Sequence, residues 1–96
     1  MRIMYSIINI LYSNGAKSKL YALSQKDIIE ALAADGEHWN ERTIYNKLRE
    51  LLANNLILEG LKRGNAKTFY IDQVGIDWMK EMQGDCDEEG DVTNNE

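Results

Sequence analysis

Apolar side chains recur at helical spacing near the start of the chain. The i, i+3, i+4, i+7 spacing of an α-helix runs through residues 2–12, at Met4, Ile7, Ile8 and Leu11. Most of the intervening residues are apolar too, and a helix that is apolar nearly all round needs cover on two sides. We expect either a helix with its own core on one side and a partner subunit on the other, or a buried core helix or strand.

Three later stretches share one pattern of helix start. In each, an apolar residue precedes a capping residue, and a second apolar residue follows in the first helical turns; the caps are Ser24, Asn40 and Asp72. A capping oxygen satisfies a free backbone N–H, and the two apolar residues pack across the helix start. We therefore expect helices over 25–34, 40–54 and 73–82, with Asp35-Gly36 ending the first of them.

The helix predicted over 40–54 is amphipathic. Its apolar stripe consists of Ile44, Leu48, Leu51 and Leu52. At ~100° per residue, the other side carries polar residues, namely Arg42, Thr43, Asn46, Arg49 and Glu50, with Lys47 at its shoulder. Arg42 and Asn46 lie one turn apart, and these residue types make bidentate contacts to guanine and adenine edges in the DNA major groove. An ordinary solvated helix face also carries such residues, and Glu50 supports that second interpretation.

A two-stranded ribbon is predicted after this helix. Residues 56–62 and 67–71 have the composition of strands, and residues 63–66, Arg-Gly-Asn-Ala, are typical of a turn. Basic residues gather around the tip, at Lys62, Arg63 and Lys67. Folding of a hairpin gives no reason to gather like charges, which repel one another, whereas a nearby phosphate backbone does.

The net charge of −5 is distributed unevenly. Between Arg42 and Lys67, six basic residues face two acidic ones, a local charge of +4, and residues 1–84 together carry +1. The acidity lies in residues 85–96, which hold six acidic residues and one large apolar one. We expect one domain over 1–84 and a disordered acidic tail over 85–96 that competes with DNA for the basic face.

The tail also matches a calcium-binding loop in spacing. Its residues at positions 1, 3, 5, 6, 7, 8, 9 and 12 of such a loop are Asp85, Asp87, Glu89, Gly90, Asp91, Val92, Thr93 and Glu96. A glutamate at position 5 is longer than the usual residue, and no second loop is present to pair with the first. We favour the solvating tail over a calcium site.

Several classes of protein fit the sequence poorly. No apolar run approaches the ~18 residues of a membrane span. A single cysteine, Cys86, excludes an internal disulfide and fits a reducing cytoplasm. The lone His38 has no second ligand at metal spacing, and no nucleophile–base set can be assembled. We expect a cytoplasmic protein that is not an enzyme and needs no cofactor.

The segment NERTIYNKLRELLANNLILEG, a basic hairpin and KTFYIDQVGIDWMKEM together resemble winged helix-turn-helix transcriptional regulators, with the PadR-like and MarR-like families nearest. The resemblance covers about residues 20–82. It departs from those families in having Asp72 in place of a threonine, no proline before the third helix and no long C-terminal dimerisation helix.

The resemblance implies a mainly α fold with a small β-hairpin. The expected order is helix 2–12, a short strand at 20–23, helices 25–34 and 40–54, the hairpin and helix 73–82. By analogy, Arg42, Thr43, Asn46, Lys47 and Arg49 would face the major groove, and Lys62, Arg63 and Lys67 of the wing would contact the DNA backbone. We expect a sequence-specific regulator of transcription, dimeric through its first or last helix. The alternative is a winged helix that binds protein, or a phage or plasmid accessory factor for replication.

Overall fold

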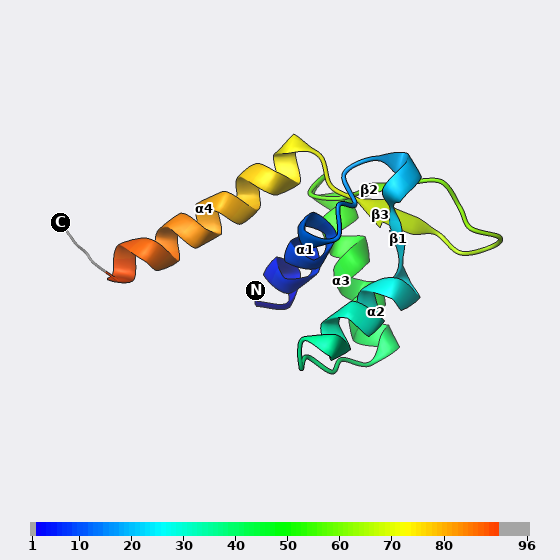
Figure 1. The fold of residues 1–96 in the computed structure, drawn as a ribbon, viewed down its shortest axis with the longest axis horizontal. Helices are drawn as coiled ribbons and strands as arrows, with labels where there is room; N and C mark the ends of the chain where they lie inside the picture. Colours follow the sequence, from blue (N-terminus) through cyan, green and yellow to red (C-terminus); the bar gives the residue numbers. More distant parts are fainter. Residues whose placement is uncertain (1, 91–96) are drawn as a thin grey trace.

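Helices and a small antiparallel sheet make up the computed structural model, which describes residues 2–90 and the side chains of residues 2–83. The elements are α1 (Arg2–Ser13), a 3-10 turn η1 (Lys19–Tyr21), β1 (Leu23–Ser24), α2 (Gln25–Ala34), α3 (Glu41–Ala53), β2 (Leu58–Glu59), β3 (Thr68–Tyr70) and α4 (Gln73–Gly90) (Figure 1). The predicted order of elements is confirmed, as is the fold class.

The three helix starts form as the sequence predicts. Ser24 Oγ accepts a hydrogen bond from the N–H of Asp27 at 3.1 Å, and the Asp27 carboxylate accepts one from Ser24 N–H at 3.2 Å. Asn40 caps α3 by accepting from Thr43 N–H at 2.7 Å, and Asp72 accepts from Val74 N–H at 3.1 Å. Local side chains therefore fix where each helix begins.

The strands are shorter than predicted. Their order in the sheet is β1-β3-β2, and β2 spans only Leu58–Glu59 of the expected 56–62. The chain leaves β2 at Gly60, where an added Cβ would lie 2.9 Å from the carbonyl oxygen of Lys19. The next residue donates its N–H to that same oxygen, from Leu61 at 3.3 Å. The ribbon thus pairs with η1 beyond Gly60, and η1 occupies part of the strand predicted at 20–23.

Helix α1 lies at the centre of the core. Its apolar residues Ile3, Met4, Ile7, Ile8, Ile10 and Leu11 are all buried, and α2, α3 and α4 pack against it. Of the alternatives for this segment, the buried core helix is therefore the observed one. Its apolar faces are covered within a single chain, so they need no partner subunit.

Helix α4 extends past the end predicted at Met82, to Gly90 (Figure 1). Gln83 on this helix donates a hydrogen bond to the hydroxyl of Tyr5 in α1 at 2.9 Å, and Met79 is buried in the core. Acidic residues cost a helix only tenths of a kcal/mol each, so acidity alone does not end one. The predicted end of this helix at Met82 is therefore wrong. Residues 91–96, which include part of the predicted tail and of the calcium-loop pattern, lie outside the described residues.

No helix in residues 2–90 is long and apolar enough to span a lipid bilayer.

Gly75 marks a close approach between α4 and the chain that follows α3. A Cβ at this position would collide with the backbone carbonyl oxygen of Leu56 and lie 3.3 Å from the side chain of Ile71. We expect Gly75→Ala to lower the free energy of unfolding by about 1–3 kcal/mol, the usual cost of overpacking. Urea unfolding measures this. The neighbouring Val74→Ala, at a side chain that is 52% exposed, should change stability by less than about 0.5 kcal/mol.

Candidate nucleic-acid interface

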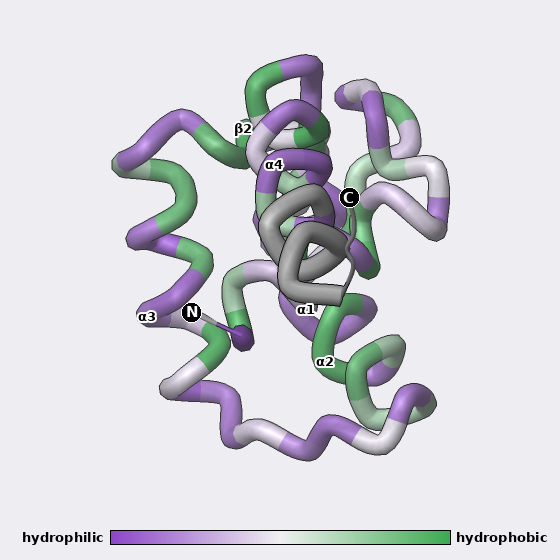
Figure 2. The backbone as a smooth tube through the Cα atoms, turned by 90° about the vertical axis from the view of Figure 1, so that its left-hand side faces the viewer, coloured by the Kyte–Doolittle hydropathy of each residue, from purple (hydrophilic) through white to green (hydrophobic). Residues whose placement is uncertain are grey.

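Helix α3 buries one face and exposes the other, as predicted. Ile44, Leu48 and Leu51 are buried in the core, and hydrophobic and hydrophilic segments alternate along this helix in Figure 2. The exposed residues of this helix are Glu41, Arg42, Tyr45, Asn46, Arg49, Glu50 and Ala53. Arg42 and Asn46, which the sequence places one turn apart, are therefore both accessible on the first half of the helix.

The start of α3 is held against α2. Gln25, the first residue of α2, donates a hydrogen bond from Nε2 to the carbonyl oxygen of Glu41 at 2.9 Å. Asn40 caps the same helix end from within the connecting turn. These contacts set the angle between the two helices and leave the exposed face of α3 turned to solvent.

Two of the predicted site residues on α3 make contacts within the helix. Lys47 is half-buried, and its Nζ lies 3.3 Å from a carboxylate oxygen of Glu50. The guanidinium of Arg49 lies over the ring of Tyr45, 5.8 Å from its centroid. Thr43 is half-buried, and its N–H donates to the cap. The charges on this face are thus partly balanced by their neighbours.

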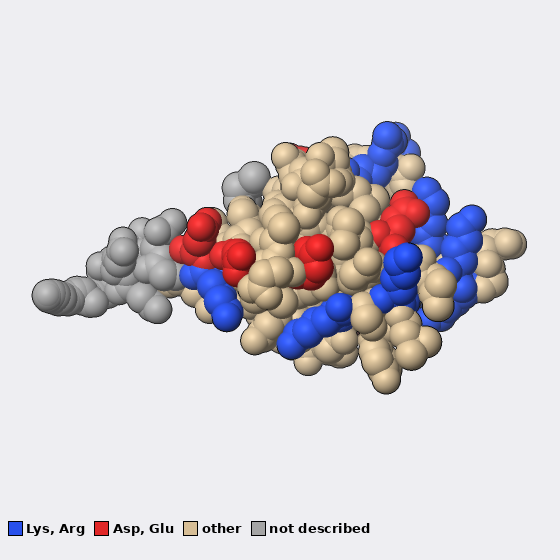
Figure 3. All heavy atoms as spheres, turned by 90° about the horizontal axis from the view of Figure 1, so that it is seen from above, with Lys and Arg blue, Asp and Glu red and all other residues tan. Residues whose placement is uncertain are grey.

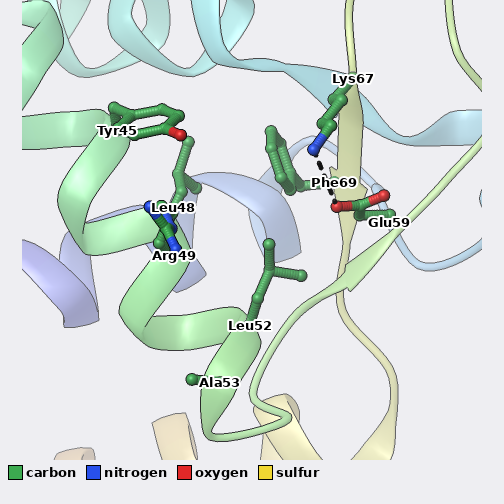
Figure 4. Close-up of a pocket in the computed structure, with 8 residues that line it drawn as sticks. All are labelled: Tyr45, Leu48, Arg49, Leu52, Ala53, Glu59, Lys67 and Phe69. Carbon is green, nitrogen blue, oxygen red and sulfur yellow. Dashed lines mark ion pairs between the residues drawn. The ribbon is translucent and has the colours of Figure 1, made fainter.

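A groove of about 560 Å³ separates α3 from the wing, the hairpin of β2 and β3 with its connecting residues 60–67 (Figure 4). Its lining residues are Tyr45, Leu48, Arg49, Leu52, Ala53, Glu59, Lys67 and Phe69. Arg49 flanks the groove from α3, and Lys67 flanks it from the wing. Because Lys67 Nζ lies 3.7 Å from a carboxylate oxygen of Glu59, an acid also borders this groove.

The three basic residues of the wing differ in their surroundings. Arg63 turns back toward α2, with Nη1 2.9 Å from Asp27 Oδ2 and Nη2 2.8 Å from the carbonyl oxygen of Ala22. Lys67 pairs with Glu59, whereas no ion pair among residues 2–83 involves Lys62. Folding therefore does account for two of the basic residues here, Arg63 and Lys67, contrary to the prediction from the sequence. Sequence reasoning missed both acidic partners.

Basic residues gather toward the wing. In Figure 3, Lys and Arg cluster at the end of the molecule opposite α4, while Asp and Glu on that face lie mostly nearer α4. The predicted site residues thus lie on two neighbouring elements, α3 and the wing, and Arg49 and Lys67 are brought to opposite sides of one groove.

No protein-family model and no curated protein matches the sequence. Solved structures do match. The winged-helix DNA-binding protein from STIV is 19% identical with a TM-score of 0.76, and the match covers 98% of each chain. The protein in the complex structure of hsRosR-S4 is 16% identical in sequence with a TM-score of 0.75, and the match covers 98% of this chain and 76% of the other.

A PadR family transcriptional regulator from Eggerthella lenta is 16% identical with a TM-score of 0.67, covering 82% of this chain and 69% of that one. At these identities the likeness concerns the fold. The chain has a winged helix-turn-helix fold, in which α2 and α3 form the helix-turn-helix and β2 and β3 form the wing.

Proposed function

We propose that the protein is a cytoplasmic DNA-binding regulator of transcription, with α3 in the major groove and the wing on the DNA backbone. The observation that carries this proposal is the exposed polar face of α3 beside a groove flanked by Arg49 and Lys67. The winged-helix protein from STIV is described as DNA-binding, and the E. lenta protein as a transcriptional regulator. Both descriptions support the same role here.

The exposed side chains divide into two roles under this proposal. Arg42 and Asn46 would read base edges, because arginine and asparagine match guanine and adenine in the major groove. Positively charged side chains would bind phosphates and set the register of the protein on the duplex, namely Lys47, Arg49, Lys62 and Lys67. Thr43 lies between the two groups at the start of α3.

The salt dependence of DNA binding tests this function. Random-sequence duplex DNA with a fluorescent label is titrated with the full chain at ~50 and ~200 mM salt. The four proposed phosphate contacts would weaken binding about 150-fold between these concentrations, since each contact releases condensed counterions. Failure to bind random duplex at ~50 mM salt would overturn the proposed function.

Glu59, the acidic residue beside the groove, should oppose DNA binding. We expect Glu59→Gln to tighten DNA binding by about threefold to fivefold, because it frees Lys67 and removes a negative charge near the phosphates. The same titration at ~50 mM salt measures this. Glu81→Gln on α4 makes the same change in net charge away from the wing and should leave the affinity unchanged. Equal effects of the two variants would show that only net charge matters.

A dimer contact through α4 belongs to the same proposal. The apolar side chains of α1 are already buried within one chain, whereas the C-terminal part of α4 projects past the other helices (Figure 1). Val74 is 52% exposed, and Ile76 and Trp78 are half-buried. A two-fold dimer would offer two α3 helices to half-sites about one helical turn of DNA apart. Sedimentation equilibrium of the full chain distinguishes a dimer from a monomer.

A second candidate function is binding of a protein partner. Leu20, Tyr21 and Leu61 are 69%, 65% and 57% exposed, and the Leu61 N–H bond to the Lys19 carbonyl brings their segments together. Exposed apolar residues that lie close together mark interaction surfaces. This function would be favoured if the full chain fails to bind DNA in the titration above.

A further inference from the structure

Arg63, at the tip of the wing, makes two hydrogen bonds to residues at the start of α2 and in the segment before it. Its Nη1 lies 2.9 Å from Asp27 Oδ2, and its Nη2 lies 2.8 Å from the carbonyl oxygen of Ala22. A planar guanidinium fits two such acceptors at once, and hydrogen bonds to a carboxylate are among the stronger ones. These two bonds use two of the five N–H donors of the guanidinium and hold the side chain toward the start of α2.

The acceptor Asp27 is itself fixed. It is the third residue of α2, and its Oδ2 accepts the N–H of Ser24 at 3.2 Å as half of the capping box. The same oxygen therefore joins the start of α2 to the wing. Since α2 is held to α3 through the Gln25 bond to Glu41, the connection runs from the wing to the helix-turn-helix.

The wing has few other supports. Its base is held where Gly60 crosses η1, by the Gly60 N–H bond to Thr68 at 2.9 Å and by Thr68 Oγ1, which donates to the Leu61 carbonyl at 2.6 Å. Beyond the base, the backbone pairing of the tip is the Arg63–Ala66 bridge. Residues 62–67 are all exposed. Because β2 has only two residues and the tip of the wing is exposed, a further contact is needed to hold the wing in one orientation.

We propose that Arg63 is a positioning residue, which sets the direction of the wing through Asp27 and Ala22, and is not a phosphate contact. We call the contacts of Arg63 with Asp27 and Ala22 the brace. The effect of the brace on DNA binding rests on the proposed function, but the brace itself is a property of the free protein. If Arg63 has this role, the wing is already ordered before the protein meets DNA, so binding does not have to pay the entropy of ordering the tip. Lys62 and Lys67 are then the residues that the wing presents to phosphates.

The free protein tests the brace directly. Arg63→Ala, Arg63→Lys and Asp27→Ala should each lower the backbone order parameters of Gly64 and Asn65, from a rigid value of about 0.8 toward 0.6 or less, as measured by ¹⁵N relaxation. Ser24→Ala is the matched control, because it removes the other half of the capping box and leaves the Asp27 carboxylate in place. Unchanged order at Gly64 and Asn65 in Arg63→Ala would overturn the proposal.

DNA binding separates a positioning residue from a phosphate contact. Lysine keeps the charge but cannot reach both acceptors in the same geometry. We therefore expect Arg63→Lys to lose as much affinity as Arg63→Ala, about threefold to tenfold, as the cost of ordering the wing on binding. Combining Asp27→Ala with Arg63→Ala should weaken binding no further than the weaker-binding single variant.

Two results would contradict the role of Arg63 as a positioning residue in DNA binding. Affinity retained by Arg63→Lys, or tighter binding by Asp27→Ala, would show that the freed cation binds phosphate. A wild-type protein that does not bind DNA would instead refute the proposed function, while the order parameters would still decide whether the brace exists.

Discussion

Replacing Ile7 by alanine should lower the free energy of unfolding by about 2–5 kcal/mol, the largest effect on stability that we expect from one substitution. Ile7 is fully buried in α1, which packs against α2, α3 and α4. Three helices would have to move together to close the resulting cavity, so little of the lost volume can be recovered. Total stabilities of small domains are about 5–15 kcal/mol, so this variant approaches the folding limit.

Urea unfolding of the variant, followed by far-UV circular dichroism, gives this quantity. Asn9→Ala, on the same helix and half-buried, serves as the control and should stay within about 0.5 kcal/mol of the wild type. A loss below about 1 kcal/mol in Ile7→Ala would mean that α1 does not lie at the centre of the core.

The second large effect concerns sequence preference. We expect Asn46→Ala to reduce discrimination at one base pair by about 1–3 kcal/mol, because one bidentate contact to a base edge is lost. Asn46 is exposed on the first half of α3, one turn from Arg42. The measurement first selects a preferred duplex from a random pool with the wild type. It then compares affinities for that duplex and for each single base-pair change.

Lys62→Ala is the matched comparison. A phosphate contact carries no sequence information, so its loss should weaken binding to every duplex alike and reduce the salt slope by about 0.9. If Asn46→Ala and Lys62→Ala gave the same profile over the set of duplexes, the division into reading and positioning residues would be wrong.

The sequence was informative where the determining contacts are local. The cap at Asn40 acts on Thr43, three residues away, and the stripe through Ile44 and Leu48 follows the helical repeat, so the start and orientation of α3 could both be predicted. The exposure of Arg42 and Asn46 follows from that orientation.

Contacts between distant residues could not be predicted in this way. Asp27 and Arg63 are 36 residues apart and meet only because the wing folds back onto the start of α2. The Glu59–Lys67 pair depends on the register of β2 and β3. Both strands are shorter than the sequence predicts. The sequence therefore presents the wing as a cluster of free cations, whereas among the described residues two of its three cations, Arg63 and Lys67, have acidic partners.

The proposed function requires that one surface, formed by α3 and the wing, binds DNA. Chemical-shift mapping tests it most directly: random duplex DNA is added to the ¹⁵N-labelled full chain, and shifts are recorded for each backbone amide. We expect the largest shifts within residues 40–50 and 60–67, with little change at η1 or in α1. Largest shifts at η1 or in α4, with α3 unaffected, would contradict the proposed function.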